Sequence, residues 1–302
     1  MRRFGFTMLE LVFVIVVMGI IGKFGVEFLA QAYKSFIYSN INNSLQAESE
    51  MAVESIASRL QYRIKDSIIA RQPGVKFEAL SSSTLDTNAT VLEWIGTDIE
   101  GFRGNKRPNW SGIIDISTSS AILLDSPETN TTAINDLIGI LSHGSGTGIN
   151  NSAIYFVGSN SDITKYGWNG VAFTDQSNVM HPIKSGAAIN ELIPRNATDG
   201  TTNSFAGVDV FEYYQLAWSA YAVALTNYNA ATKSGDLRLY YDYQPWEGES
   251  YTDANASSAL LMQNVSTFRF KAVGSVVKIQ VCTKSSLLQN EEYSLCKEKT
   301  IF

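Results

Sequence analysis

Hydrophobic residues follow three successive patterns along the chain. Residues 6–22 read FTMLELVFVIVVMGIIG and are apolar from end to end except for Glu10. Beyond them, apolar residues recur at spacings of four or seven, which is typical of one helix face. From Val75 onward the pattern changes to short β-rich runs separated by turn residues. The pattern therefore predicts an α+β chain, with a long N-terminal helix and an antiparallel sheet.

The first apolar run has the length and composition of a membrane anchor. Residues 6–22 form about 25 Å of helix, against ~30 Å for the hydrocarbon core of a bilayer, and further apolar residues extend the run to Ala30. Lys23 and Glu27 interrupt this extension, but their i, i+4 spacing favours a pair on one helix face. A secretory signal peptide needs a small-residue cleavage site after its apolar core. The run continues into helix-like sequence instead, which predicts a retained transmembrane helix over 6–30.

The next segment, 31–72, is predicted to be the amphipathic half of the same helix, which needs a sheet to lie on. Pro73 and Gly74 end the periodic pattern, so we expect one helix from about Phe6 to Ile69. Its apolar stripe consists of Ile41, Leu45, Ala52, Ile56, Leu60, Ile64 and Ile68.

The first residues add a more specific signal. The motif GFTMLEL, at Gly5–Leu11, follows the basic head Met1–Phe4. It resembles the prepilin leader of type IV pilins and type II secretion pseudopilins. The amphipathic stretch Ala47–Ile68 is also similar to the corresponding helix of larger minor subunits of the PilW and GspJ type.

The resemblance implies a processing site and an assembly residue. A prepilin peptidase would remove the leader, residues 1–5, by cutting between Gly5 and Phe6, and would methylate Phe6. Glu10 would be the family's glutamate, which pairs with the terminal amine of a neighbouring subunit. The implied partners are this peptidase, other pilin or pseudopilin subunits, an inner-membrane assembly platform and, before assembly, membrane lipid.

The basic residues Arg2 and Arg3 predict the orientation in the membrane. Positive residues beside a membrane span remain cytoplasmic, so the bulk of the chain would lie in the periplasm before it enters a pilus or pseudopilus. The remaining segment, 73–302, is predicted to be one β-rich globular domain, since 45% of the chain is hydrophobic and no clear linker divides the segment. The candidate strands are Thr90–Ile95, Ala121–Leu124, Ala153–Val157, Val208–Tyr214, Leu237–Tyr243, Val265–Ala272, Val276–Cys282 and Lys297–Phe302, with a short helix at Thr132–Leu141.

The two cysteines, Cys282 and Cys296, are expected to form a disulfide. A chain outside the inner membrane meets an oxidising compartment, in which paired cysteines oxidise by default. Cys282 ends a strand-like run and Cys296 begins the next, so the bond would close the base of a hairpin. Type IV pilins commonly carry such a C-terminal disulfide loop.

Motifs that suggest enzyme or metal chemistry are weak. The glycine-rich stretch 143–148, HGSGTG, lacks the Gly-Lys-Ser/Thr ending of a phosphate-binding loop. His143 and His181 have no neighbours at metal-ligand spacing. Oxygen ligands at 160–162 and 199–203 match no complete calcium loop, and turn chemistry explains them as well. We therefore expect no catalytic residue, no metal and no cofactor.

A nucleic acid partner is also not expected. The net charge of −6 opposes bulk electrostatic attraction to DNA. One basic cluster with an adjacent aromatic ring offers a contact for DNA or an acidic partner; it consists of Arg103, Lys106, Arg107 and Trp110. The alternative is a solvated loop whose positive charge is balanced by nearby acidic residues, namely Asp98, Glu100 and Asp115. The later aromatic set is interpreted as packing rather than a sugar-binding platform; it comprises Tyr240, Tyr241, Tyr243, Trp246 and Tyr251.

The sequence thus favours a structural subunit, a minor pilin or pseudopilin, with a pilin-like fold in which the long helix packs on the sheet. Two other classes remain open. One is a filament-tip adhesin or DNA-uptake receptor that uses the long polar loops. The other is a periplasmic enzyme that this helix only anchors.

Overall fold

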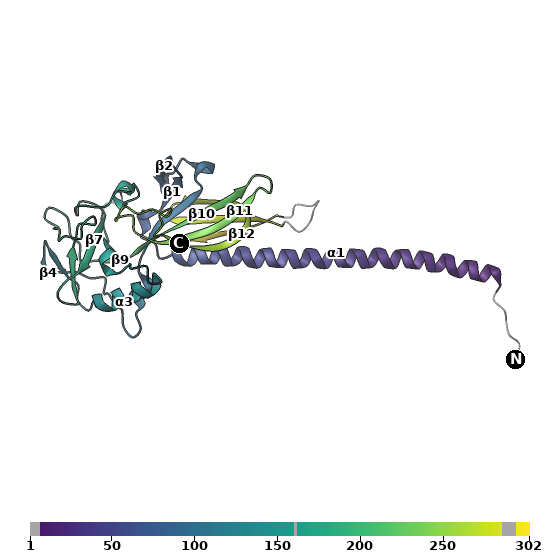
Figure 1. Cartoon of the computed structure of the whole chain (residues 1–302), viewed down its shortest axis with the longest axis horizontal. Helices are drawn as coiled ribbons and strands as arrows, with labels where there is room; N and C mark the ends of the chain where they lie inside the picture. Colours follow the sequence, from purple (N-terminus) through teal and green to yellow (C-terminus); the bar gives the residue numbers. More distant parts are fainter. Residues whose placement is uncertain (1–6, 160–161, 286–293) are drawn as a thin grey trace. The chain divides into compact units, whose positions relative to one another are not determined.

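The α+β class, with a long N-terminal helix on antiparallel sheet, is confirmed by the computed structural model (Figure 1). The structure describes residues 7–159, 162–285 and 294–302. The chain forms two compact units, Met1–Glu48 and Ser49–Phe302. The first unit contains most of one helix, and the second contains the end of that helix and both sheets.

Helix α1, Met8–Leu60, is 53 residues long. Its last turns, from Ser49, belong to the globular unit and bury one face. Ala52, Val53, Ile56 and Leu60 are buried, whereas Glu50 and Met51 are exposed. The predicted amphipathic stripe is therefore confirmed for this part of the helix.

The helix is shorter than predicted, because it ends at Leu60 rather than near Ile69. The backbone after Leu60 bonds to the sheet: Ile64 N donates to the carbonyl of Ile95 at 2.9 Å, and Thr97 N donates to that of Tyr62 at 2.9 Å. A short 3₁₀ turn, η1 (Lys65–Ser67), follows and leads into a strand. The isoleucines that continue the helical spacing are β-branched, and such residues favour strands. Pro73 and Gly74 instead lie in the turn that follows this strand.

The first sheet has eight strands, and every neighbouring pair is antiparallel. Their spatial order is β14-β13-β12-β11-β10-β3-β1-β2. The strands are β1 (Ile69–Gln72), β2 (Lys76–Ala79), β3 (Val91–Gly96), β10 (Ser219–Asn229), β11 (Ser234–Tyr243), β12 (Ser257–Val273), β13 (Val276–Lys284) and β14 (Ser294–Ile301).

The second sheet lies between β3 and β10 in the sequence, with the order β4-β5-β8-β7-β6-β9. Its strands are β4 (Asp115–Ser120), β5 (Leu123–Asp125), β6 (Ala153–Phe156), β7 (Met180–Ser185), β8 (Glu191–Pro194) and β9 (Tyr214–Ala217). Two helices, α2 (Ile99–Arg103) and α3 (Thr131–Leu141), accompany it. Short 3₁₀ turns complete the chain: η2 (Leu80–Ser82), η3 (Asp86–Asn88), η4 (Ile149–Asn151) and η5 (Ile163–Tyr166).

This second sheet is an insertion into the first. Strands β3 and β10 are neighbours in the first sheet, where Gly96 pairs with Ser219. Residues 97–218 therefore connect the end of β3 to the start of β10, which is its neighbour in the first sheet.

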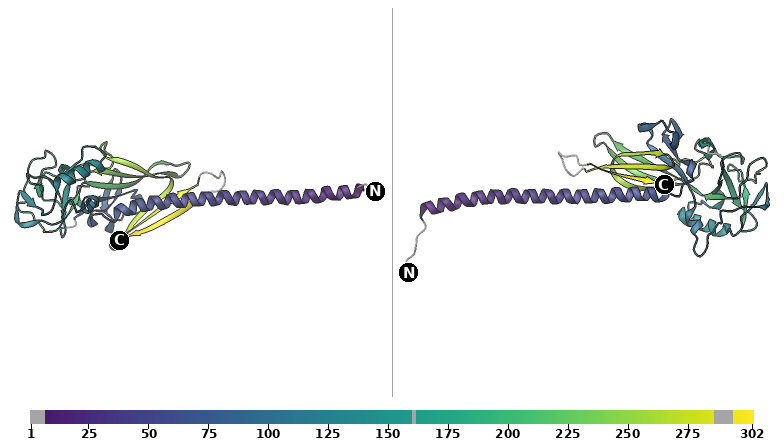
Figure 2. Two further views of the ribbon diagram at one scale, coloured as in Figure 1. Left: turned by 90° about the horizontal axis from the view of Figure 1, so that it is seen from below. Right: turned by 180° about the vertical axis from the view of Figure 1, so that it is seen from behind.

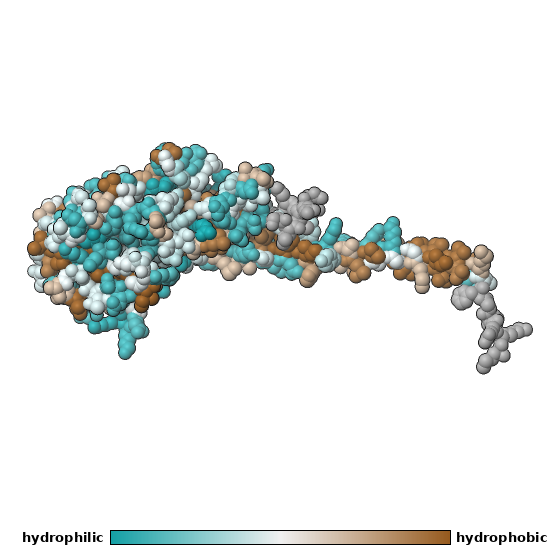
Figure 3. Space-filling model, in the orientation of Figure 1, coloured by the Kyte–Doolittle hydropathy of each residue, from teal (hydrophilic) through white to brown (hydrophobic). Residues whose placement is uncertain are grey.

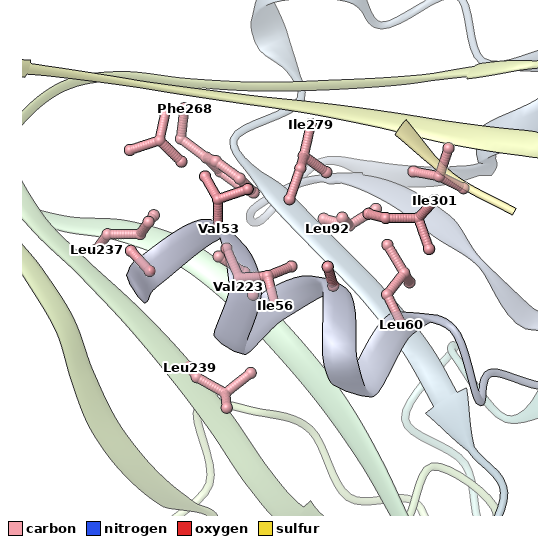
Figure 4. Packing of buried hydrophobic residues seen from close by; sticks show 14 of the residues in the cluster. Val53, Ile56, Leu60, Leu92, Val223, Leu237, Leu239, Phe268, Ile279 and Ile301 are labelled. Atoms are coloured by element: carbon pink, nitrogen blue, oxygen red, sulfur yellow. The ribbon is translucent and has the colours of Figure 1, made fainter. Parts of the chain in front are cut away.

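Three apolar clusters hold the globular unit together. In the first, the buried face of α1 packs on one face of the first sheet, as Figure 4 shows for Val53, Ile56 and Leu60. In the second, the other face of that sheet is covered by residues of the insertion, among them Tyr166 and Trp168. The third lies within the insertion, around Ile134 and Phe156. Strands β13 and β14 run beside the last turns of α1 (Figure 2), where Lys297 Nζ lies 3.2 Å from Glu50 Oε2.

Six of the eight predicted strands and the predicted short helix are confirmed. Their ends shift by at most three residues, except that β12 begins at Ser257, eight residues before the predicted start at Val265. The prediction for Val208–Tyr214 is wrong, because β9 begins only at Tyr214. The preceding backbone bonds to a loop instead: Ile114 N donates to the carbonyl of Glu212, and Tyr214 N to that of Gly112. The predicted strand Ala121–Leu124 is confirmed only in its second half, because β5 begins at Leu123. Ala121 lies in the tight turn before β5, across which Ser120 pairs with Leu123.

Candidate functional site

The start of α1 is fixed by a reciprocal cap between Thr7 and Glu10. The Thr7 backbone N and Oγ1 donate to Glu10 Oε2 at 3.0 and 2.9 Å, and Glu10 N donates to Thr7 Oγ1 at 3.3 Å. This is the capping box of Ser/Thr-x-x-Glu sequences, which satisfies amide groups that a helix start leaves free. Sequence reasoning missed this role for Thr7, although the TMLE spacing contains it. Gly5 and Phe6, the predicted cleavage and methylation positions, lie outside the described residues.

From Met8 to Phe36, α1 presents an exposed apolar surface (Figure 3). Leu9, Phe13 and Phe28 expose 81%, 68% and 70% of their area, although residues of these types are usually buried in globular proteins. The helix is long and apolar enough to cross a membrane. Lys23 Nζ and Glu27 Oε1 lie 3.9 Å apart at the predicted i, i+4 spacing.

Cys282 and Cys296 form a disulfide, with their Cα atoms 4.0 Å apart. The two residues are directly paired partners in β13 and β14, so the bond joins the two strands across the ladder as predicted. On chain entropy, closing a loop of this size contributes about 3 kcal/mol to stability.

The two histidines lie in unlike environments. His143 is exposed in the turn after α3, where its Nδ1 lies 3.4 Å from the carbonyl oxygen of Ile140. His181 is buried in β7, with its ring centroid 5.0 Å from Phe156 and 5.3 Å from Phe205. Burial lowers the pKa of His181 to about 3, which a backbone hydrogen bond with Gln176 partly opposes. His181 is therefore a neutral core residue.

The predicted basic cluster does not form one surface with its aromatic neighbour. Trp110 is 3% exposed, and its indole N–H donates to the carbonyl of Asp98 at 3.1 Å. Arg103 donates to the hydroxyl of Tyr62 at 2.8 Å, and Arg107 to Glu128 at 3.3 Å. Among the expected balancing acids, Asp98 instead caps α2 through the amide of Gly101, and Asp115 accepts from Ser117. A buried indole is unavailable for stacking on a base.

The remaining candidates have ordinary structural roles. The Asp199 carboxylate accepts from the backbone N and the hydroxyl of Thr201, as turn chemistry predicts. In the other calcium candidate, Asn160 and Ser161 lie outside the described residues. The predicted packing of the late aromatic set is confirmed, since Tyr243 and Trp246 are fully buried and Tyr240 meets Tyr251 edge to face.

A buried ion pair between Arg71 and Glu93 was not predicted. Arg71 Nε donates to Glu93, and Arg71 also reaches the carbonyl of Trp168 at 3.1 Å. The hydroxyl of Tyr243 donates to the second carboxylate oxygen at 3.0 Å. Burial raises the pKa of Glu93, whereas Arg71 and Tyr243 lower it. Glu93 interrupts the apolar run VLEWIG, and that interruption is the sequence signal for this site.

Comparisons of the chain with protein-family models, with curated proteins and with solved structures find no match.

Proposed function

We propose that this chain is a structural subunit, a minor pilin or pseudopilin, of a type IV pilus or a type II secretion-like filament. In this proposal a prepilin peptidase cuts between Gly5 and Phe6, and the subunit assembles through α1. It acts as a building block, without catalysis of its own. The observation that carries the proposal is the exposed apolar surface of α1 from Met8 to Phe36.

That surface requires partners other than water. Burying one large apolar side chain contributes about 1.5–3 kcal/mol, so the free energy of leaving this many exposed is large. A bilayer satisfies the surface before assembly, with Arg2 and Arg3 on the cytoplasmic side. A bundle of identical or related helices would satisfy it afterwards, because helices of this kind pack on one another.

Glu10 gives the bundle its register. It lies among apolar residues, and a carboxylate moved into such a bundle is costly unless a positive group pairs with it. The new amino terminus at Phe6 of a neighbouring subunit supplies that charge. Subunits in any other register would leave the Glu10 carboxylate desolvated, with its hydrogen bonds from Thr7 but without a cation.

The processing step is tested with Gly5→Ala in cells that contain an active prepilin peptidase. We expect the variant to keep its leader, as seen by mass spectrometry of the N-terminus, because in the family that the motif resembles the peptidase cuts after this glycine. Gly22→Ala, farther along the same apolar run, is the matched control and should be processed. Normal processing of Gly5→Ala would falsify the proposal.

The assembly step is tested with Glu10→Ala. We expect the variant to insert in the membrane but to enter sheared filaments at a small fraction of the wild-type level. Glu27→Ala is the control, since Glu27 is an exposed carboxylate on the same helix with its own partner, Lys23. Equal incorporation of both variants would remove the pairing argument.

A further inference from the structure

Strand β12 changes its neighbours along its length. It pairs with β11 as far as Val265 and with β13 from Val265 to Val273. Within the described chain, residues 266–272 therefore have a paired strand on one side only. Since successive residues of an antiparallel strand direct their backbone groups to opposite edges, about half of the amide and carbonyl groups of 266–272 point away from β13.

This free edge borders an open groove of about 850 Å³. Consecutive β12 residues 266–272 line one side of it, together with residues 278–280 of β13 and Glu298 of β14, and residues of the segment 80–90, with η2 and η3, line the other. Phe270 and Leu225, which are half-buried, give the groove apolar parts, whereas Ser81, Thr84 and Thr87 supply hydroxyl groups. The volume and the mixed lining suit an extended peptide, whose side chains alternate in direction.

The groove carries charges of both signs, and its positive ones lie on β12 and β13: Arg269, Lys271 and Lys278 line it together with Asp86 and Glu298. Lys271 lies directly opposite Lys278 in the β12–β13 ladder, and like charges in this position are destabilising. Arg269 projects from the same face, two residues along β12. Lys278 has a partner, Glu298, at 3.4 Å, but Arg269 and Lys271 are exposed and form no ion pair within the described part of the chain.

We propose that this groove binds an extended acidic peptide segment of a partner protein, which adds as a strand to the free edge of β12. The backbone of the peptide would pair with 266–272, and its carboxylates would meet Arg269 and Lys271. The proposal is independent of the filament role, because it uses only the globular unit and concerns what that unit recognises.

The geometry favours a peptide over a nucleic acid as the anionic occupant. Single-stranded nucleic acids bind through exposed aromatic rings on which the bases stack. Two aromatic rings line the groove: Phe268 is 7% exposed and packs in the first apolar cluster, and Phe270 is half-buried and packs against that cluster. An unpaired strand edge, by contrast, offers hydrogen bonds that an extended peptide satisfies and a phosphate backbone does not.

The test measures binding of synthetic peptides to the full chain in detergent micelles by fluorescence anisotropy. The probe is a nine-residue peptide of alternating Glu and Val, compared with a Lys and Val peptide and with the acidic peptide N-methylated on alternate amides. We expect the acidic peptide to bind, and the other two to bind at least about tenfold more weakly. N-methylation leaves the charge of the acidic peptide unchanged but removes backbone donors. Weaker binding of the N-methylated peptide therefore measures the contribution of strand pairing alone.

Variants locate the site. The double variant Arg269→Glu and Lys271→Glu should weaken binding of the acidic peptide by about tenfold or more, whereas Lys106→Glu, an exposed lysine in the α2–β4 loop, should not. Equal binding of the acidic and basic peptides, insensitivity to N-methylation, or no binding of the acidic peptide would each overturn the proposal. The proposal would also be overturned if a single-stranded oligonucleotide bound more tightly than the acidic peptide and the double variant abolished that binding. The groove would then be a nucleic acid site.

Discussion

The ionisable side chains inside the globular unit differ in how their charge is accommodated. Glu93 is fully buried but keeps two donors, Arg71 and Tyr243. His181 is equally buried but has no charged partner in the described structure, and its Nδ1 lacks a hydrogen bond there. At the residue scale, we therefore expect the stability of the fold to fall when Glu93 loses a partner and when acid protonates His181.

Removing Arg71 tests the first case. We expect Arg71→Met to lower the free energy of unfolding by about 3–5 kcal/mol, because it leaves the Glu93 carboxylate buried without its cation. The double variant Arg71→Met with Glu93→Leu should recover much of this loss. Urea denaturation gives the values. The control is Arg107→Met, since Arg107 and Glu128 have side chains 77% and 80% exposed and such pairs contribute at most about 1 kcal/mol. Similar losses at both sites would contradict the prediction.

Acid tests the second case. The folded-state pKa of His181, about 3, lies below the ordinary value of 6.5. The unfolded chain therefore binds this proton at a higher pH than the folded chain does. The stability that depends on neutral His181 is complete above about pH 6.5 and falls as the pH drops towards 3, by up to about 1.4 kcal/mol per pH unit.

His181→Gln should consequently flatten the loss of stability between pH 6.5 and pH 4, measured as the difference in urea midpoints from wild type. His143→Gln, at the exposed histidine, should leave the wild-type slope. A variant slope as steep as that of wild type would mean that other groups cause the acid sensitivity.

At the scale of elements, the last turns of α1 contribute to stability through one face only. Ile56 has no exposed area and contacts the first sheet, whereas Met51 is 64% exposed on the opposite face. We expect Ile56→Ala to lower the free energy of unfolding by about 2–5 kcal/mol. Met51→Ala should change it by less than about 0.5 kcal/mol. Equal effects on the urea midpoint would show that this helix face does not pack on the sheet in solution.

The same elements show what the sequence could predict. The α1 stripe was found because Ala52, Ile56 and Leu60 repeat at the helical period. Strand β10 was missed because its inward positions include Ala220, Ala222 and Ala224, which have low strand propensity. These alanines are buried beneath aromatic residues of the insertion, a long-range contact that no local pattern contains.

The functional features also divide into those that the sequence could predict and those that it could not. The disulfide and the exposed apolar helix were predictable because each follows from spacing or composition in one stretch. The β12 groove was not, since it depends on where β11 ends its pairing and on a segment nearly two hundred residues earlier in the chain.

At the scale of the whole molecule, the two units need different surroundings. Residues 49–302 contain all three apolar clusters and the disulfide. We expect a fragment that begins at Ser49 to fold with its disulfide formed and to elute as a monomer without detergent, while the full chain requires detergent. Size-exclusion chromatography and circular dichroism measure this. Aggregation of the fragment would show that residues before Ser49 are needed to complete the globular unit.

The position of the second sheet also leads to an expectation about the order of folding. Gly96 and Ser219 pair in adjacent strands, but closing a loop of that length costs about 4 kcal/mol of chain entropy before any contact compensates it. Collapse of residues 97–218 around their own cluster would shorten the effective loop and bring β3 and β10 together. We therefore expect the first sheet to be completed after the insertion has collapsed, so that two strands that are neighbours in space pair late. Until they pair, the edges of β3 and β10 would be exposed, and we expect aggregation to begin from that state rather than from the native chain.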